Sequence, residues 1–523
     1  MLGHTDSRLG PRLPQELLDI IVSNLDGHPA TLARCALVSS RLYQLSEKLL
    51  YRRFTLGPPV RYDHRSPTKT RPNLQSTHNL FLLLSKKPYL ADYIEELTIT
   101  NRGPLFTWLD RSATDWMCNS HADTIGKVMF SLTNLRRLSL IGVVSQASDD
   151  GYLDWLEFSG TFRYTMFYAL AKLEKLEVVR LEHVDNVPLA LFDRLPSGMK
   201  ELILHGVAWA PDGYDPPEGL LKESLLSIEG KRFQKRTTGT ESAWKPCQLE
   251  TLCLHLHDSC YWPFASYLFS SPAAPQLGRL RRLHCGMREP EDHQQIWQLV
   301  SKCQETLERF EFFPAWPVSH EETMIDHIDF SALLNLRYIY FNFFIQADSW
   351  GADDWAPWVA RTMNKLSYPM IPSTRFPSTP LSVSPSSSFG SSSSSSSSSS
   401  TSLASSELSL TAPNRLPLHQ PGPNRIESIR IRLEFGFTEC DDLYLNLSHW
   451  RSVDNVLAFR DDFPSLKEVR VDVVCVDDGT RPYLDSLLVE IKAQFPKLTK
   501  RGIVHVAEGH FLAAWCSSEC LEA

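Results

Sequence analysis

The stretch LTNLRRLSL, residues 132–140, contains the short pattern that decides the fold expected for this chain. Its apolar residues Leu135, Leu138 and Leu140 follow the order apolar-x-x-apolar-x-apolar. Alternate side chains of a β-strand point to opposite faces, so Leu138 and Leu140 are predicted to point into a core. Three further stretches repeat the pattern closely: LEKLEVVRL (173–181), LLNLRYIYF (333–341) and FPSLKEVRV (463–471).

Ten copies of this phrase occur along the chain, each predicting a short strand. They are Ile94-Leu97-Ile99, Leu135-Leu138-Leu140, Leu176-Val179-Leu181, Met199-Leu202-Leu204, Leu249-Leu252-Leu254, Leu280-Leu283-Cys285, Leu307-Phe310-Phe312, Leu336-Ile339-Phe341, Ile426-Ile429-Ile431 and Leu466-Val469-Val471. Apolar stretches between the phrases predict helices that return the chain on the other side of the core. These stretches are 80–84, 165–173, 293–300 and 483–495.

The phrases resemble leucine-rich-repeat proteins over roughly residues 92–500. The resemblance implies an α/β solenoid of horseshoe shape, with strands lining a concave face and helices on the convex side. The steps between the ten middle anchors are uneven, at 41, 41, 23, 50, 31, 27, 29, 90 and 40 residues. An unrelated α/β domain with several Leu-rich strands therefore remains an alternative.

The N-terminal stretch LPQELLDIIVSNLDGHPATLARCALVSSRLYQLSEKLLYRRF, residues 13–54, predicts three short amphipathic helices. Pro14 suits the start of a helix, and Glu16 suits the positive end of the helix dipole. Leu17, Leu18 and Ile21 then fall on one helical face. After a break at 26–29 the same apolar spacing returns on two further helices.

The start Leu-Pro-x-Glu-Leu-Leu and the later Ala-Leu-Val-Ser resemble an F-box over residues 11–56. The resemblance implies docking on the Skp-type adaptor of a cullin-RING ubiquitin ligase through apolar side chains. Many F-boxes have Trp where this chain has Leu42. An N-terminal helical cap over the end of the repeats is the alternative. The adaptor-binding residues implied are Leu13, Pro14, Leu17, Leu18, Ile21, Val38 and Leu42.

Composition narrows the class of protein. The formal net charge of -8 and the sequence pI of about 6.1 argue against nucleic-acid binding, which needs a basic surface. We find neither the apolar core of a secretory signal nor a run of 18 apolar residues, so we expect no membrane association and an intracellular location, cytoplasmic or nuclear. Eleven scattered cysteines favour reduced thiols.

The predicted organisation has six parts. Residues 369–424 are dominated by Ser, Thr and Pro, and we expect them to form a disordered insertion. The parts are 11–56 adaptor-binding helices, 57–91 connector, 92–368 first part of the repeat body with a loop insertion at 208–246, 369–424 disordered insertion, 425–500 last part of the repeat body and 501–523 C-terminal tail.

The sequence contains no motif for catalysis or cofactor binding that we could find: no Gly-x-Ser-x-Gly, no phosphate-binding loop and no His-Glu-x-x-His. We therefore predict neither an enzyme nor a cofactor. The nearest approach to a metal site lies in KPCQLETLCLHLHDSC, which lacks the second Cys/His pair of a usual zinc site. Side chains lining an exposed strand face explain the same alternation without a metal, so we predict no metal site. The candidate ligands are Cys247, Cys253, His255, His257 and Cys260.

Residues between the strand anchors are predicted to form one extended surface. In the later phrases Arg, His and Tyr concentrate there, which suggests a site for an acidic or phosphorylated protein segment. Pairing of each Arg with a neighbouring acid is the alternative. The predicted substrate-binding residues are His255, His257, Arg282, His284, Arg309, Tyr338, Tyr340, Arg430, Arg432 and Arg470.

Together these features predict a non-catalytic substrate receptor that brings a protein to a ligase bound at its N-terminal helices. A leucine-rich-repeat scaffold without a ligase is the first alternative, and an enzyme with an unrecognised site is the second. The Trp-rich phrase DSWGADDWAPW (348–358) is either an exposed recognition element or core beneath an insertion.

Overall fold

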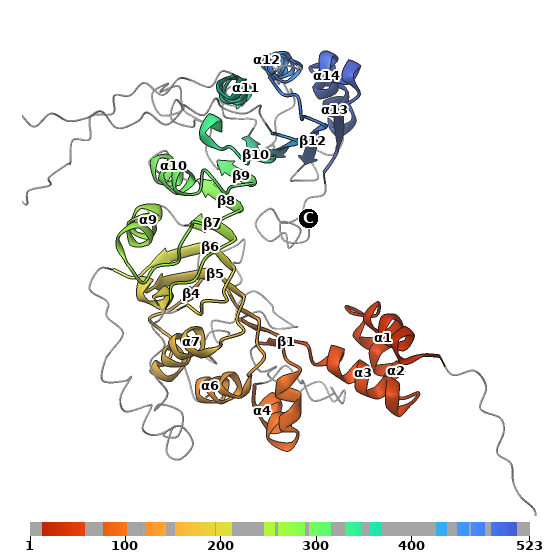
Figure 1. Ribbon diagram of the computed structural model, residues 1–523, viewed down its shortest axis with the longest axis vertical. Helices are drawn as coiled ribbons and strands as arrows, with labels where there is room; N and C mark the ends of the chain where they lie inside the picture. Colours follow the sequence, from red (N-terminus) through yellow and green to blue (C-terminus); the bar gives the residue numbers. More distant parts are fainter. Residues whose placement is uncertain are drawn as a thin grey trace, which may run out of the picture.

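The structure is a computed structural model in which a small helical segment leads into a long curved sheet covered by helices on its outer side (Figure 1). It describes residues 13–57, 77–101, 117, 121–142, 152–193, 195–211, 245–256, 260–287, 292–314, 330–346, 355–367, 425–436, 447–459, 462–475 and 483–509. The predicted insertion at 369–424, most of the predicted loop at 208–246 and His257 lie outside the described residues.

The first three helices form as the sequence predicts: α1 (Gln15–Ser23), α2 (Pro29–Ala36) and α3 (Ser40–Leu50). Pro14 precedes α1 at the N-cap position, where its missing N–H costs nothing. The turn before α2 uses Gly27 at φ +90°, a conformation that glycine adopts without strain. The hydroxyl of Ser39 accepts the backbone N–H of Leu42 and so caps α3.

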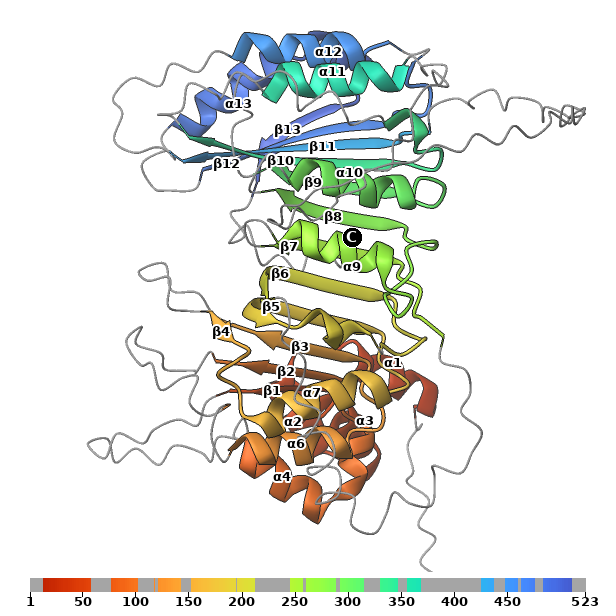
Figure 2. The ribbon, with the colours of Figure 1, turned by 90° about the vertical axis from the view of Figure 1, so that its left-hand side faces the viewer.

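Behind these helices lies a sheet of 13 strands in which every pairing is parallel. Twelve strands follow one another in chain order, β4 pairs only with β5, and the sheet is not closed (Figure 2). The strands are β1 (Arg53–Leu56), β2 (Glu96–Thr100), β3 (Arg137–Ile141), β4 (Leu153–Asp154), β5 (Val178–Val187), β6 (Glu201–Trp209), β7 (Thr251–Leu256), β8 (Arg282–Met287), β9 (Arg309–Pro314), β10 (Tyr338–Gln346), β11 (Ser428–Gly436), β12 (Glu468–Cys475) and β13 (Val504–Glu508).

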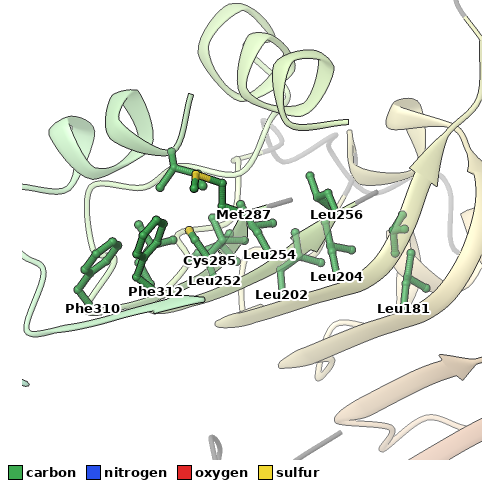
Figure 3. Packing of buried hydrophobic residues seen from close by; sticks show 14 of the residues in the cluster. Leu181, Leu202, Leu204, Leu252, Leu254, Leu256, Cys285, Met287, Phe310 and Phe312 are labelled. Atoms are coloured by element: carbon green, nitrogen blue, oxygen red, sulfur yellow. The ribbon is translucent and has the colours of Figure 1, made fainter. Parts of the chain in front are cut away.

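All ten predicted phrases fall on strands, from β2 to β12 with β4 left out. The middle and last anchor of each phrase are buried in one hydrophobic cluster, as Leu202, Leu204, Leu252 and Leu254 illustrate (Figure 3). Burial of this apolar surface is the main favourable contribution to folding. The uneven steps between phrases do not disturb the sheet, because the differences in length lie in the connections between strands.

Helices cover one face of the sheet (Figures 1 and 2). The four predicted stretches coincide with α4, α7, α10 and α13. Trp355 and Trp358 on α11 are 1% and 2% exposed, so the core alternative for the Trp-rich phrase is right for these two residues. The helices are α4 (Thr77–Lys86), α6 (His121–Ser131), α7 (Gly160–Lys172), α9 (Tyr261–Ser270), α10 (Asp292–Lys302), α11 (Trp355–Ser367), α12 (Trp450–Leu457), α13 (Leu484–Ala493) and α14 (Pro496–Arg501), with 3-10 turns η1 (Pro88–Asp92), η3 (Leu189–Phe192), η5 (Phe330–Ala332) and η6 (Leu447–His449).

The sheet extends beyond the limits that the sequence predicts for the repeat body. Strand β1 lies within the predicted adaptor segment and pairs with β2, with Leu56 opposite Ile99. Strand β13 lies within the predicted tail and pairs with β12, with Val504 opposite Val469. Leu56 is fully buried and Val504 is half-buried against the same hydrophobic cluster, so the core reaches both end regions.

The residue directly before each strand alternates in charge along the sheet from β1 to β12, if β4 is left out. The backbone N–H of each of these residues donates to the carbonyl of the one before it, at 2.7–2.9 Å. We call this set the charge ladder. In order its members are Arg52, Glu95, Arg136, Glu177, Lys200, Glu250, Arg281, Glu308, Arg337, Glu427 and Lys467.

Neighbouring members of the charge ladder form ion pairs. Glu427 lies between two cations, 2.6 Å from Lys467 and 3.6 Å from Arg337. Opposite charges on adjacent strands stabilise a sheet, whereas like charges in direct opposition destabilise it. Each exposed pair contributes only about 0–1 kcal/mol, so the ladder chiefly favours one register over shifted ones. The other pairs are Arg52–Glu95, Arg136–Glu177, Lys200–Glu177 and Arg281–Glu308.

Among the described residues no helix is both long and apolar enough to span a bilayer. The seven cysteines that the structure describes are all free thiols.

Two leucines of the phrase LLNLRYIYF provide a matched test of the core. Leu336 is 2% exposed and Leu334 is 55% exposed. We expect Leu336→Ala to lower the free energy of unfolding by about 2–5 kcal/mol, because it leaves a cavity, and Leu334→Ala to change it by less than about 0.5 kcal/mol. Urea unfolding followed by circular dichroism measures both, and equal effects would contradict the placement of these side chains.

Glu427 tests the charge ladder through pH. The hydrogen bond from Lys467, together with the charges of Lys467 and Arg337, lowers the pKa of Glu427. Because this pKa is lower in the folded state than the unfolded-state pKa of about 4.3, ionised Glu427 stabilises the fold above about pH 4.3. That stabilisation is lost as the pH falls through the folded-state pKa. We therefore expect Glu427→Gln to be less stable than wild type at pH 7, with the difference closing below about pH 4.

Thermal unfolding at several pH values measures this difference. Glu490→Gln makes the same chemical change on the exposed side of α13 and serves as the control. A stability difference for Glu427→Gln that stays constant from pH 7 to acid would show that the ion pairs of Glu427 contribute nothing.

Candidate interaction surfaces

The N-terminal helices and their connections expose six large aliphatic side chains within one short segment. They bury Val22 and Leu32 between them, at 1% and 2% exposure, but leave the six outside. Isolated exposed apolar residues are ordinary on soluble proteins, whereas a concentration of this size marks an interaction site. The six are Leu13, Leu17, Ile20, Ile21, Leu37 and Val38.

The predicted adaptor-binding residues divide by exposure. Leu13, Leu17, Ile21 and Val38 are 45–73% exposed, and Pro14 is exposed as well. Leu18 and Leu42 are half-buried among the helices, so they contribute to the packing of the segment.

The sequence prediction left out Ile20 at 55% exposure and Leu37 at 88%. Leu37 follows the last residue of α2 and directly precedes Val38 in the Ala-Leu-Val-Ser phrase. Leu37 lies in the connection between two helices, where no helix covers it, and this position could have indicated its exposure from the sequence.

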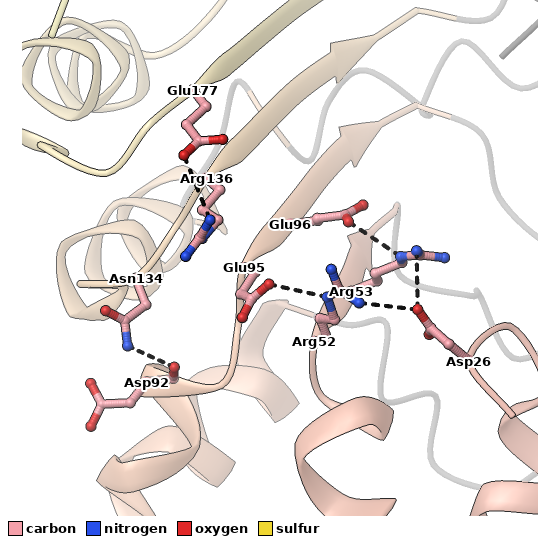
Figure 4. A network of polar contacts seen from close by, with 9 residues as sticks. All are labelled: Asp26, Arg52, Arg53, Asp92, Glu95, Glu96, Asn134, Arg136 and Glu177. Carbon is pink, nitrogen blue, oxygen red and sulfur yellow. Dashed lines mark hydrogen bonds and ion pairs between the residues drawn. The ribbon is translucent and has the colours of Figure 1, made fainter. Parts of the chain in front are cut away.

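An ionic network fastens these helices to the sheet (Figure 4). Asp26, in the connection between α1 and α2, lies 3.1 Å from Arg52 and 3.3 Å from Arg53. The same two arginines pair with β2 and the residue before it, at 3.1 Å to Glu95 and 3.3 Å to Glu96. Only two residues separate the end of α3 from the start of β1, so the connection between the two parts is very short.

Glu47 on α3 makes a second connection. Its carboxylate is 7% exposed and accepts hydrogen bonds from Tyr43 at 2.5 Å and from Tyr89 of η1 at 3.3 Å, with Lys87 at 3.7 Å. The hydrogen bond with Glu47 raises the pKa of Tyr43. The charges of Tyr43 and Tyr89 raise the pKa of Lys87. The helices are thus connected to the sheet through β1 and through η1.

A comparison with known families identifies this segment. Residues 11–57 match the F-box-like family. The chain therefore has an F-box-like domain, which includes α1, α2, α3 and β1. No curated protein matches the chain.

The strand residues that alternate with the core anchors form a second surface, which we call the polar face. Four strands carry Arg two residues before an acid, and these positions lie on the same side of a strand. The side chains pair: Arg309 lies 2.5 Å from Glu311 and Arg470 lies 2.7 Å from Asp472. The other two pairs are Arg180–Glu182 and Arg432–Glu434.

These pairs change how the predicted substrate-binding residues are interpreted. Asp472, which is 0% exposed, pairs with Arg430 from the neighbouring strand as well as with Arg470. The pairing of Arg with nearby acids, which the sequence left as the alternative, therefore holds for Arg309, Arg430, Arg432 and Arg470. The polar face has mixed charge.

Three predicted residues stay exposed on this face, among them the paired Arg470. Arg282 at the start of β8 is exposed, and Tyr338 at the start of β10 is 42% exposed. Tyr340 is only 9% exposed, and the guanidinium of Arg430 lies 5.1 Å from its ring centre. Accessible side chains thus lie near the beginnings of the strands, whereas later positions such as Phe313 are buried.

Burial and pairing shift the carboxyl pKa values of the polar face in opposite directions. Burial raises the pKa of Glu182, against the effect of Arg180. Glu311 is buried too, which alone would raise its pKa, but hydrogen bonds and charge from His284 and Arg309 lower it overall. The carboxylate of Glu311 is therefore held ionised between two donors, at 2.9 Å from His284 and 2.5 Å from Arg309.

A row of imidazole rings crosses the middle of the polar face. His183, His205, His255 and His284 come from successive strands, with ring centres 4.9, 5.3 and 4.4 Å apart. The row continues in Phe313, whose ring stacks on His284 at 4.3 Å. The sequence prediction included only His255 and His284, because alignment of the row depends on the register of four strands.

Glycines make room for this row. A Cβ at Gly206, which has φ +58°, would lie 2.5 Å from the ring of His183. A Cβ at Gly286 would contact the ring of His255. At these two positions a larger residue would push an imidazole out of the row.

The structure describes four of the five ligands considered from the sequence, all but His257, and separates them. Cys247 is 1% exposed in the hydrophobic core, where burial raises its pKa to about 12, and Cys260 lies at the start of α9. Cys253 and His255 remain together on β7. His284 of β8 lies beside them. It was not among the candidate ligands because those were taken from one short stretch of sequence.

Proposed function

We propose that this chain is a non-catalytic substrate receptor of an SCF-type ubiquitin ligase. The observation that carries the proposal is the F-box-like domain with its exposed apolar side chains, joined without a flexible link to a long sheet. In this proposal the helices dock a Skp-type adaptor and, through it, a cullin. The polar face holds a protein substrate, and the associated ligase transfers ubiquitin.

The body is proposed to be an irregular leucine-rich-repeat solenoid. Its ten apolar-x-x-apolar-x-apolar phrases and its parallel strands in chain order support this. In such an architecture each unit contacts only its neighbours, which accommodates steps of 23 to 90 residues between phrases.

The proposed mechanism is proximity. A bound substrate near the ligase reacts at an effectively raised concentration, and this gain depends on how well the two are oriented. The ion pairs of Asp26 and the hydrogen bonds of Glu47 support a fixed angle between adaptor and substrate. The receptor itself needs no catalytic group.

The exposed apolar residues of the F-box-like domain provide the first test. We expect Leu17→Asp with Ile21→Asp to reduce co-purification of the Skp-type adaptor and cullin by roughly tenfold or more, because burying each side chain contributes about 1.5–3 kcal/mol. Leu37→Asp with Val38→Asp should act alike. Quantitative mass spectrometry of affinity-purified chain measures the recovery.

The control is Val489→Asp with Phe459→Asp, which changes two apolar residues outside the F-box-like domain that are even more exposed, at 69% and 61%. Its adaptor recovery should equal wild type. Equal recovery by all variants, or no adaptor with wild type, would instead favour a scaffold without a ligase.

The polar face provides the second test. The variant Leu17→Asp with Ile21→Asp, here called the docking variant, should still bind the substrate without bringing it to the ligase. We expect Arg282→Glu with Tyr338→Ala to lose a bound protein that the docking variant retains. Proximity labelling compares the two, and a substrate should accumulate in cells with the docking variant.

Arg279→Glu with Leu334→Ala makes the same two kinds of change at exposed positions outside the strands and serves as the control. A labelling profile that is the same for the polar-face variant and this control would remove Arg282 and Tyr338 from the proposed site.

A further inference from the structure

Three side chains of metal-ligating type converge on the polar face. They are Cys253 and His255 of β7 and His284 of β8, and their ligand atoms lie within 4.8 Å of one another. In a tetrahedral zinc site the bond lengths place sulfur and nitrogen ligands about 3.3–3.6 Å apart. Small side-chain rotations would bring the three atoms to that spacing.

The parallel register explains the convergence. Cys253 and His255 are two residues apart on one strand, so they share a face. Register places His284 directly beside Cys253 and places Gly286 beside His255. Because Gly286 has no side chain, the ring of His255 occupies the space over β8 and its Nε2 meets Nε2 of His284. The site is thus built on two rigid strands of a sheet.

A carboxylate orients the imidazole of His284. Nδ1 of His284 lies 2.9 Å from Oε2 of Glu311, and an ionised carboxylate can only accept, so Nδ1 carries the proton. In the neutral form of the ring, which is the form that binds a metal, the lone pair of Nε2 then faces His255 and Cys253. Carboxylates that hold a ligating His in this way are typical of zinc sites. Arg309, 2.5 Å from Glu311, fixes the carboxylate in turn.

We propose that Sγ of Cys253, Nε2 of His255 and Nε2 of His284 bind a zinc ion on the polar face. One thiolate and two imidazoles suit Zn²⁺, whereas Mg²⁺ and Ca²⁺ require oxygen ligands. Three protein ligands leave the fourth tetrahedral position for water or for a side chain of a bound protein. Binding releases the thiol proton of Cys253. The site does not depend on adaptor docking.

Without a metal, the facing nitrogens of His255 and His284 would share a single proton in a hydrogen bond. The two arrangements differ in whether Cys253 takes part. A thiolate bound to a metal gives a sulfur-to-metal charge-transfer absorption with Co²⁺, which a hydrogen bond between imidazoles does not.

The experiment uses the full chain, stripped of metal with a chelator and then titrated with Zn²⁺ or Co²⁺. We expect wild type to retain roughly one more zinc per chain after desalting than Cys253→Ser with His284→Gln, measured by mass spectrometry of the metal. Co²⁺ should give the thiolate charge-transfer band in wild type but not in this double variant. Zinc should also raise the melting temperature of wild type more than that of the variant.

The control is Cys475→Ser, which changes a cysteine of equal burial class on β12 and should keep the full zinc content and the cobalt band. His255→Gln serves as an independent variant in case the double variant folds poorly, and circular dichroism checks each fold. The same zinc content in wild type and both site variants, or a cobalt band that survives in the double variant, would overturn the proposal.

Discussion

The parallel register of the strands is the constraint on which the rest of this structure depends. From β2 to β12, with β4 left out, the residue before each strand donates its backbone N–H to the same position of the preceding unit. Each such hydrogen bond fixes the next strand, and with it the side of the sheet on which every later side chain lies. A shift by one residue would turn Leu138 and Leu140 outward and bring Arg137 and Ser139 into the core.

The register also produces the functional surfaces. All strands run in the same direction, from the F-box-like domain to β13. The exposed residues Arg282 and Tyr338 therefore lie at the same edge of the sheet as Arg52 and Arg53, where the N-terminal helices attach. The register brings His284 beside Cys253, although the two are 31 residues apart in sequence. Alternating charge favours this register over its neighbours at little cost, because the ladder lies at the solvent-exposed edge.

The strands were predictable from the sequence because the three-anchor phrase reports directly which side chains enter the core. Strand β1 carries the same phrase as Tyr51, Phe54 and Leu56, but it was assigned to the preceding helices. Strand β13 lacks the first apolar anchor, having Arg501 in that position. Local spacing therefore found the strands between these ends and missed the two at the boundaries.

The sites were less predictable than the fold. Exposure of Leu17 and Ile21 followed from helical periodicity, whereas Leu37 lies in a connection that periodicity does not describe. The sequence raised the pairing of arginines with nearby acids, such as Arg309 with Glu311, but not the pairing of Arg430 with Asp472, which meet only across two strands. Such contacts depend on register over long separations, which no short sequence window contains.

Hydrogen–deuterium exchange of the full chain, with and without a purified Skp-type adaptor, tests the central claim most directly. The account predicts slower exchange in α1 and around residues 36–39 when the adaptor is present, with exchange in β5 to β12 unchanged. Unchanged exchange throughout the F-box-like domain at saturating adaptor, or protection confined to the sheet, would contradict it.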